Sequence, residues 1–202
     1  MTDFANLVVA VPGDPTLLEL YKAQLDVDSN DTSQDLVLSQ YLEMAGAAAE
    51  SYIDNVIEQR SVTENFSHTR TPVAMRYWPY VDNLVVTIAG EVVTDEFTVY
   101  LDEGLGWAVK GTGSSKSSDF EQMVLTYDAG YNPLPADLAF ALIQSGGVYS
   151  QGSSGGPVSK ESIVGVGSVT YDTSDSSGSS VRVGMLPASA VAVLDTYRRM
   201  YA

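Results

Sequence analysis

The stretch Gly152-Ser-Ser-Gly-Gly-Pro157 contains the residue types with which hydrolases position a nucleophilic serine. Residues 152–156 satisfy the pattern G-x-S-x-G, in which Ser154 would be the nucleophile. In that motif a strand enters the turn and a helix leaves it, which holds the serine in a strained conformation. Here a helical pattern enters the turn and none follows Pro157, so the sequence lacks the context that this chemistry needs.

The same stretch resembles the Gly-Asp-Ser-Gly-Gly-Pro signature of chymotrypsin-like serine proteases, but Ser153 stands where that family has aspartate. A serine nucleophile needs a base to accept its proton, and His68 is the single histidine of the chain. The residues around His68, Asn-Phe-Ser-His-Thr-Arg, do not match the Thr-Ala-Ala-His context of that family's base. A serine hydrolase using Ser154 and His68 is therefore the alternative, and a Gly/Ser linker is the favoured interpretation.

Three acidic residues in the segment 26–31 have the spacing of the first half of a calcium-binding loop. Asp26, Asp28 and Asp31 follow the pattern D-x-D-x-N-D, which lacks the sixth-position glycine and the distal glutamate of an EF-hand. The chain has no cysteine and one histidine, which excludes disulfides and zinc sites built from several such ligands. We interpret the segment as a solvated turn and expect no metal, no cofactor and no catalytic residue.

The composition is acidic, with 26 aspartates and glutamates against 10 lysines and arginines and a formal net charge of −16. Such a chain cannot offer the large basic surface that binding to the outside of nucleic acid requires. An acidic wall would instead repel phosphate, so duplex DNA could slide past it without sticking. Composition alone favours the simpler interpretation that the acidity serves solubility or reflects a saline habitat.

Membrane insertion is not expected from this sequence. No window approaches 18 consecutive apolar residues, and the N-terminus lacks a basic segment followed by a long apolar run. We therefore expect a chain that is made and used in the cytoplasm or inside an assembled particle. Its 202 residues are enough for one domain of ordinary size, or for one domain with a sizeable insertion.

Hydrophobic periodicity predicts an α+β fold, in which a small helical bundle carries a β-rich insertion at 60–130. The helices are predicted near 15–25, 33–58, 135–150 and 187–199. A β arm near 163–171 is predicted within a Gly/Ser-rich, flexible arm over 151–186.

Local signals refine the first two helices. Asp14 can cap the first helix, and Glu19 can complete a capping pair with Thr16. In the second helix apolar residues recur at spacings of three and four, and its Ala-Gly centre over 45–49 allows the close approach of another helix. Residues 1–13 form an arm that can pair as an edge strand or lie on a neighbour.

Three passages in order carry a family resemblance. The first is the amphipathic helix over 36–57, followed by a β stretch that contains Thr71-Pro-Val73. The second is Leu125-Thr-Tyr-Asp-Ala-Gly-Tyr131 followed by Leu134-Pro-Ala-Asp-Leu-Ala139. The third is Leu186-Pro-Ala-Ser-Ala190 leading to Leu194-Asp-Thr-Tyr-Arg-Arg199. Over residues 14–201 the chain resembles the head–tail connector (adaptor) family of tailed double-stranded DNA bacteriophages and related gene transfer particles.

The resemblance implies that residues 1–202 form a single connector domain with a structural role and no enzymatic activity. It implies a homo-oligomeric ring, commonly a dodecamer, below the portal protein, with a stopper or tail-completion protein beneath it. Genomic double-stranded DNA would pass through the lumen without sequence-specific binding. The chain would then reside in the virion at the head–tail interface, after assembly in the host cytoplasm. Another virion module, such as a tail terminator, is the alternative within this class.

In such connectors the C-terminal segment lodges in the portal, which implies a portal-docking segment over 187–202 of this chain. The resemblance transfers this role to six residues: Leu194, Tyr197, Arg198, Arg199, Met200 and Tyr201. Tyrosine and arginine are the residue types that most often anchor protein interfaces. The alternative is a solvated helix end, where arginine simply favours the negative pole of the helix dipole.

Overall fold

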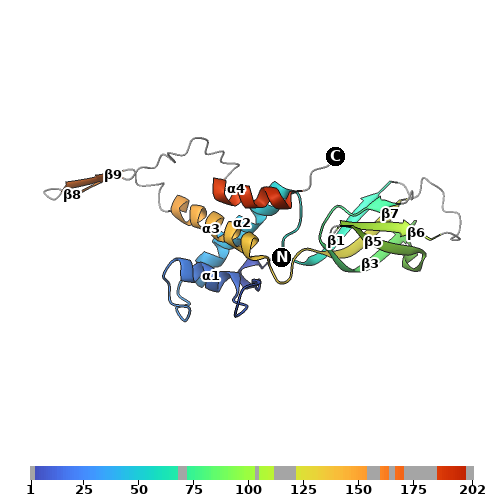
Figure 1. Cartoon of the computed structure of the whole chain (residues 1–202), viewed down its shortest axis with the longest axis horizontal. Coiled ribbons are helices and arrows are strands. Elements are labelled where there is room, and N and C mark those ends of the chain that lie inside the picture. The colour runs from blue at the N-terminus through green and yellow to red at the C-terminus, as the bar shows by residue number, and fades with distance from the viewer. Residues whose placement is uncertain are drawn as a thin grey trace. The chain divides into compact units, whose positions relative to one another are not determined.

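The computed structural model describes residues 3–67, 72–102, 105–111, 122–153, 160–163, 167–170 and 186–198. The chain divides into two compact units (Figure 1). The helical unit consists of the two ends of the chain, Met1–Asp54 and Pro133–Ala202, and the β unit consists of Asn55–Asn132. The predicted α+β fold with a β-rich insertion at 60–130 is therefore confirmed.

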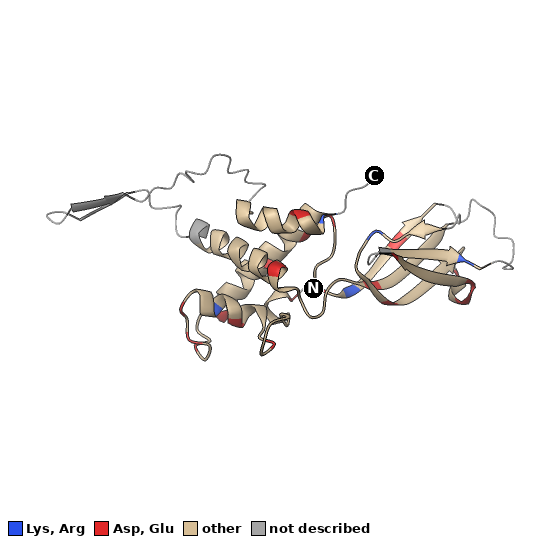
Figure 2. Cartoon of the chain, viewed as in Figure 1, with Lys and Arg blue, Asp and Glu red and all other residues tan. Residues whose placement is uncertain are grey.

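Among its described residues, the helical unit contains four helices: α1 (Leu17–Gln24), α2 (Asp35–Ile53), α3 (Ala136–Ser153) and α4 (Ala188–Leu194). Helix α2 packs against α3, and α3 packs against α4. The buried residues of α2 recur at spacings of three and four and include Leu38, Leu42 and Ala45. Charged residues are sparse on these helices: α3 carries only Asp137 and α4 carries none (Figure 2).

Helix α1 begins with the capping pair that the sequence predicts. The Thr16 hydroxyl oxygen accepts a hydrogen bond from the Glu19 backbone N–H at 3.3 Å, and Glu19 Oε2 accepts one from the Thr16 N–H at 2.7 Å. Such a cap stabilises a helix by about 1 kcal/mol. Thr16 rather than Asp14 is the N-cap, because Asp14 adopts a φ of 45° in the turn before it.

The N-terminal segment pairs with its own chain. The Ala10 N–H donates to the Leu134 carbonyl at 2.9 Å, and the Leu134 N–H donates to the Val8 carbonyl at 2.8 Å. Phe4, in the 3-10 turn η1 (Phe4–Asn6), is fully buried. A Cβ atom at position 46 would lie 2.5 Å from the Phe4 ring. At Gly46 the small-residue centre of α2 therefore admits this ring, where the sequence suggested an approaching helix.

Helix α2 ends five residues before the predicted end near 58. Asp54 takes the left-handed conformation with a φ of 54°, and its N–H donates to the Glu50 carbonyl. The next residue, Asn55, is buried and bonds the Trp78 backbone twice, through Oδ1 to the N–H at 3.0 Å and through Nδ2 to the carbonyl at 2.8 Å. Val56, which continues the apolar helical spacing, belongs to the core of the β unit.

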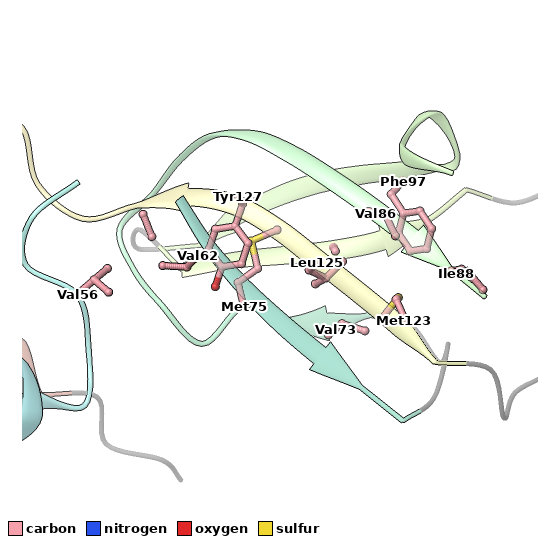
Figure 3. Close-up of a cluster of buried hydrophobic side chains, with 12 residues drawn as sticks. Val56, Val62, Val73, Met75, Val86, Ile88, Phe97, Met123, Leu125 and Tyr127 are labelled. Carbon is pink, nitrogen blue, oxygen red and sulfur yellow. The ribbon is translucent and has the colours of Figure 1, made fainter. Parts of the chain in front are cut away.

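The described part of the β unit forms two antiparallel sheets, with strand orders β1-β7-β3-β4 and β2-β6-β5. The strands are β1 (Arg60–Phe66), β2 (Val73–Ala74), β3 (Tyr80–Ile88), β4 (Glu91–Val92), β5 (Phe97–Asp102), β6 (Leu105–Lys110) and β7 (Met123–Ala129). Alternate residues of β7 are buried, as expected for a strand with one face on a core. Figure 3 shows Met123, Leu125 and Tyr127 of β7 clustered with Val86 of β3 and Phe97 of β5.

A buried tyrosine ties the loop before β3 to the first sheet. The Tyr127 hydroxyl donates to the Glu64 carboxylate and accepts from the Tyr77 N–H at 3.0 Å. Glu64 Oε1 also accepts from the Arg76 N–H at 2.8 Å. Burial, and next the bond to Glu64, raise the pKa of Tyr127 far above its ordinary value, so the hydroxyl stays protonated at neutral pH.

The two chain segments that bound the β unit approach each other closely at Gly130. This residue follows β7 with a φ of +111°, and a Cβ atom there would lie 2.6 Å from the Glu58 carbonyl oxygen. The Tyr131 N–H donates to the Ile57 carbonyl at 2.8 Å. Glycine is required here both by the conformation and by the approaching backbone.

The later part of the chain differs in detail from the prediction. The β arm predicted near 163–171 is an antiparallel hairpin of β8 (Lys160–Ile163) and β9 (Gly167–Thr170). Most of the predicted flexible arm over 151–186 lies outside the described residues. The last predicted helix, near 187–199, is the shorter α4 followed by the 3-10 turn η3 (Asp195–Tyr197).

Replacing Gly46 with alanine should destabilise the helical unit, because the new methyl group would lie within 2.5 Å of the Phe4 ring. Overpacking of this kind costs about 1–3 kcal/mol, which offsets or exceeds the roughly 1 kcal/mol that alanine gains over glycine in a helix. Gly147→Ala in α3 is the matched control, because nothing lies within 4 Å of its added methyl. Urea unfolding followed by far-ultraviolet circular dichroism should show Gly46→Ala as the less stable variant, and equal stability of the two would contradict the packing.

Candidate functional site

The candidate docking residues begin inside the helical unit. Leu194, at the end of α4, is fully buried, so in this conformation it anchors the helix and has no surface to offer a partner. Tyr197 is half-buried and Arg198 is exposed. Arg199, Met200 and Tyr201 lie outside the described residues. The structure thus brings Leu194, Tyr197 and Arg198 together at the end of α4 but assigns them different environments.

Two tyrosine–aspartate pairs fasten this end of the chain. The Tyr197 hydroxyl donates to both carboxylate oxygens of Asp137, at 2.7 and 2.8 Å. The Tyr52 hydroxyl donates to Asp195 Oδ1 at 2.6 Å. The guanidinium of Arg198 lies over the Tyr52 ring, 5.3 Å from its centre, where cation–π attraction favours it. We call these five residues the C-terminal latch.

The latch connects η3 and Arg198 to α2 through Tyr52 and to α3 through Asp137. It therefore holds η3 and Arg198 against these two helices. Arg198 contacts the ring of Tyr52, which belongs to α2. The helix dipole at the C-terminal end of the chain is therefore not the sole interaction that favours an arginine at this position. Tyr52, Asp137 and Asp195 were not predicted, because no local pattern links residues that lie 60 and 143 positions from their partners.

The Tyr52–Asp195 hydrogen bond of the latch requires a protonated tyrosine hydroxyl. The hydrogen bond to Asp195, followed by burial, raises the pKa of Tyr52 above its ordinary value of about 10. Because the raised pKa favours the protonated hydroxyl in the folded state, this contribution is fully present below pH ~10. It is lost as the pH rises through the folded pKa, because a phenolate would repel the Asp195 carboxylate.

The geometry gives the hydrolase alternative no support. Ser154 and His68 both lie outside the described residues. Helix α3 continues to Ser153, so a helix enters the G-x-S-x-G stretch where the nucleophile motif needs a strand.

The acidic segment over 26–31 forms local turns. Asp28 Oδ1 accepts from the Asn30 N–H at 2.9 Å, and Asp31 Oδ1 accepts from the Ser33 N–H at 2.9 Å. Hydrogen bonds from the Ser33 side chain, and next from its backbone N–H, lower the pKa of Asp31. Within the part of the chain that the structure describes, no three acidic or histidine side chains are grouped to hold a metal ion, and no helix is long and apolar enough to cross a membrane.

Exposed apolar side chains are the second feature of the surface. In the helical unit they are Leu36, Val37 and Met44 of α2 and Phe140 of α3, besides Val8 and Leu25. In the β unit they are Val81, Val85, Val92, Tyr100 and Leu101. Single exposed apolar side chains are common on protein surfaces, so only those that line up on one element indicate a contact surface.

Comparison with solved structures identifies the fold. The chain is similar to a chain in the structure "Neck of empty GTA particle computed with C6 symmetry", with a TM-score of 0.61 and 16% identity, over 98% of this chain and 96% of that chain. It is also similar, with the same identity and coverage, to chains of "Virion of native gene transfer agent (GTA) particle" (TM-score 0.60) and "Neck of native GTA particle computed with C12 symmetry" (TM-score 0.56). No protein-family model and no curated protein sequence matches the chain.

Substituting Tyr197 with phenylalanine should loosen the end of the chain while leaving the fold intact. The change removes the hydrogen bonds to Asp137, which contribute about 1 kcal/mol when solvent-exposed. Amide hydrogen exchange of residues 196–198 should then become roughly fivefold faster. Tyr100→Phe is the control, since the Tyr100 side chain is exposed on β5 of the other unit. Unchanged exchange in Tyr197→Phe would show that the latch does not order this segment.

Proposed function

We propose that this chain is a structural ring subunit in the neck of a phage-like particle, the adaptor between the portal and the tail. The observation that supports this most is the extent of the fold likeness, which covers nearly the whole of this chain and nearly the whole of the gene transfer agent chains. Both the helical unit and the β unit contribute to that extent. A generic helical bundle would match over one unit alone.

The proposed partners are the ones that a neck subunit needs. Copies of this chain close a ring, commonly of twelve, which binds the portal protein above and a stopper or tail-completion protein below. Genomic double-stranded DNA passes through the lumen. A chain with a net charge of −16 would line that lumen without trapping phosphate, because like charges repel. The subunit would assemble in the host cytoplasm and remain in the virion.

The portal contact is proposed for the C-terminal segment. The latch orients the chain at Arg198, and the residues beyond it include Arg199, Met200 and Tyr201. Leu194 has an indirect part in this proposal, because its buried side chain holds α4 in the helical unit. The Arg198 and Arg199 side chains would meet acidic groups on the portal, which adds orientation more than affinity.

Electron microscopy of the purified chain, with and without its cognate portal protein, tests the proposal directly. We expect rings whose symmetry matches that of the portal and which sit on one end of it. A tail terminator would also form rings, but it would bind the tail tube and leave the portal free. A chain that remains monomeric in the presence of the portal would refute the adaptor role.

Truncation tests the docking segment separately. Removing residues 199–202 keeps all five latch residues, so the circular dichroism spectrum and unfolding midpoint should stay unchanged. Portal affinity should fall by about 100-fold, the size of loss expected when a few anchoring side chains are removed. Replacing Thr32 with alanine, at an exposed position before α2, provides a control for general surface changes. Full portal affinity in the truncated chain would exclude this segment as the anchor.

A further inference from the structure

Helix α2 presents a row of uncharged side chains to solvent. Five exposed residues of the helix, Val37, Gln40, Met44, Ala47 and Ser51, follow one another at spacings of three, four, three and four. We call them the α2 seam. This spacing places them on one stripe of the helix, as in the contact stripe of a coiled coil. Leu36 lies beside the seam and is 75% exposed, while Val37 and Met44 are 46% and 50% exposed.

The seam is distinct from the face that α2 buries in its own unit. Leu38, Leu42, Ala45, Ala49 and Ile53 are buried there and occupy the other side of the helix. Helical spacing places Glu43 and Glu50 off the seam, between it and the buried face. Glu43 Oε1 accepts the Phe4 N–H at 2.7 Å. Helix α2 therefore has a buried apolar side and, opposite it, an exposed side that is uncharged and partly apolar.

The charge of the chain indicates what covers the seam. A basic partner would be attracted to the acidic surface and gain nothing from a stripe without charge. A second copy of this chain also carries a net charge of −16, so two copies repel each other wherever acidic surfaces meet. Uncharged, partly apolar surface is where they can approach at the lowest electrostatic cost.

The side chains of the seam also suit a helical surface as the partner. Larger side chains, those of Val37, Gln40 and Met44, occupy its first half and middle, and small ones, those of Ala47 and Ser51, occupy its end. Large side chains can fill gaps between the side chains of a facing helix, and small ones let the backbones come close. The seam spans about 15 residues, or roughly 22 Å of helix at 1.5 Å per residue.

We propose that the α2 seam is a subunit contact, on which the helical surface of a second copy of this chain packs. The inference rests on the proposed ring and adds to it the face through which neighbouring subunits bind. In a ring the contact is heterologous, so the seam of each copy meets a different surface of the next one.

A charge placed in the middle of the seam tests the proposal. Met44→Glu should weaken subunit association by at least about 100-fold, because every interface would bury an unpaired carboxylate. Met44→Gln has nearly the same shape without the charge and should retain most of the ring. Thr32→Glu adds the same charge at an exposed position outside the seam and should assemble like the unmodified chain. Native mass spectrometry of the full-length proteins, alone and mixed with portal, gives the oligomeric state.

The outcomes separate this inference from the proposed function. If the unmodified chain forms rings and Met44→Glu does so equally well, the seam is not the contact, while the ring itself stands. Loss of rings in both Met44→Glu and Thr32→Glu would also overturn the seam, since any added charge would then suffice. An unmodified chain that never assembles, even on the portal, would remove both. A photoreactive benzoylphenylalanine at position 44 should crosslink two copies in the ring, and one at position 32 should not.

Discussion

The packing of α2 against α3 is the contact on which the rest of the helical unit depends. These two helices come from opposite sides of the β unit in the sequence, and their contact joins the two ends of the chain into one core. Phe4 packs on α2, and α4 packs on α3, so both terminal segments need this pair to be in place. The latch then adds hydrogen bonds from η3 to the same two helices.

The three sides of α2 have different roles in the helical unit. One side of the helix is buried, one side carries glutamates, and one side remains uncharged and exposed. The end of the same helix provides Tyr52 to the latch. A single helix thus contributes to the core, to the latch and to the proposed subunit contact.

Residue patterns predicted the elements whose apolar residues repeat regularly. The helical bundle, the β-rich insertion and the capping pair of Thr16 and Glu19 follow from spacing and local hydrogen-bonding chemistry. The end of α2 does not follow from spacing, because Val56 continues the apolar repeat while packing in the β unit. What ends the helix is the left-handed backbone of Asp54 and the pairing of Asn55 with Trp78, a residue distant in sequence.

The candidate site was predictable only in part. The closing Tyr-Arg passage drew attention to Tyr197 and Arg198, but the partners that fasten them, Tyr52 and Asp137, are brought near by tertiary packing. Leu194 was predicted as a contact for a partner, and it is buried because the short α4 needs an apolar anchor. The α2 seam has the helical period of the buried side, so hydrophobic spacing alone cannot tell which side faces solvent.

Gly130 has a consequence for recognising other chains with this architecture. It lies in the passage Asp128-Ala-Gly-Tyr131, and its place is dictated by the backbone of Glu58, which leaves no room for any side chain. A glycine retained at this position in distant sequences would therefore indicate the close approach of the two segments that bound the β unit. It would carry no information about binding partners. Sequences that have diverged beyond detection in their contact surfaces would still retain this glycine, which makes it a better marker of common ancestry in the scaffold than of a shared role.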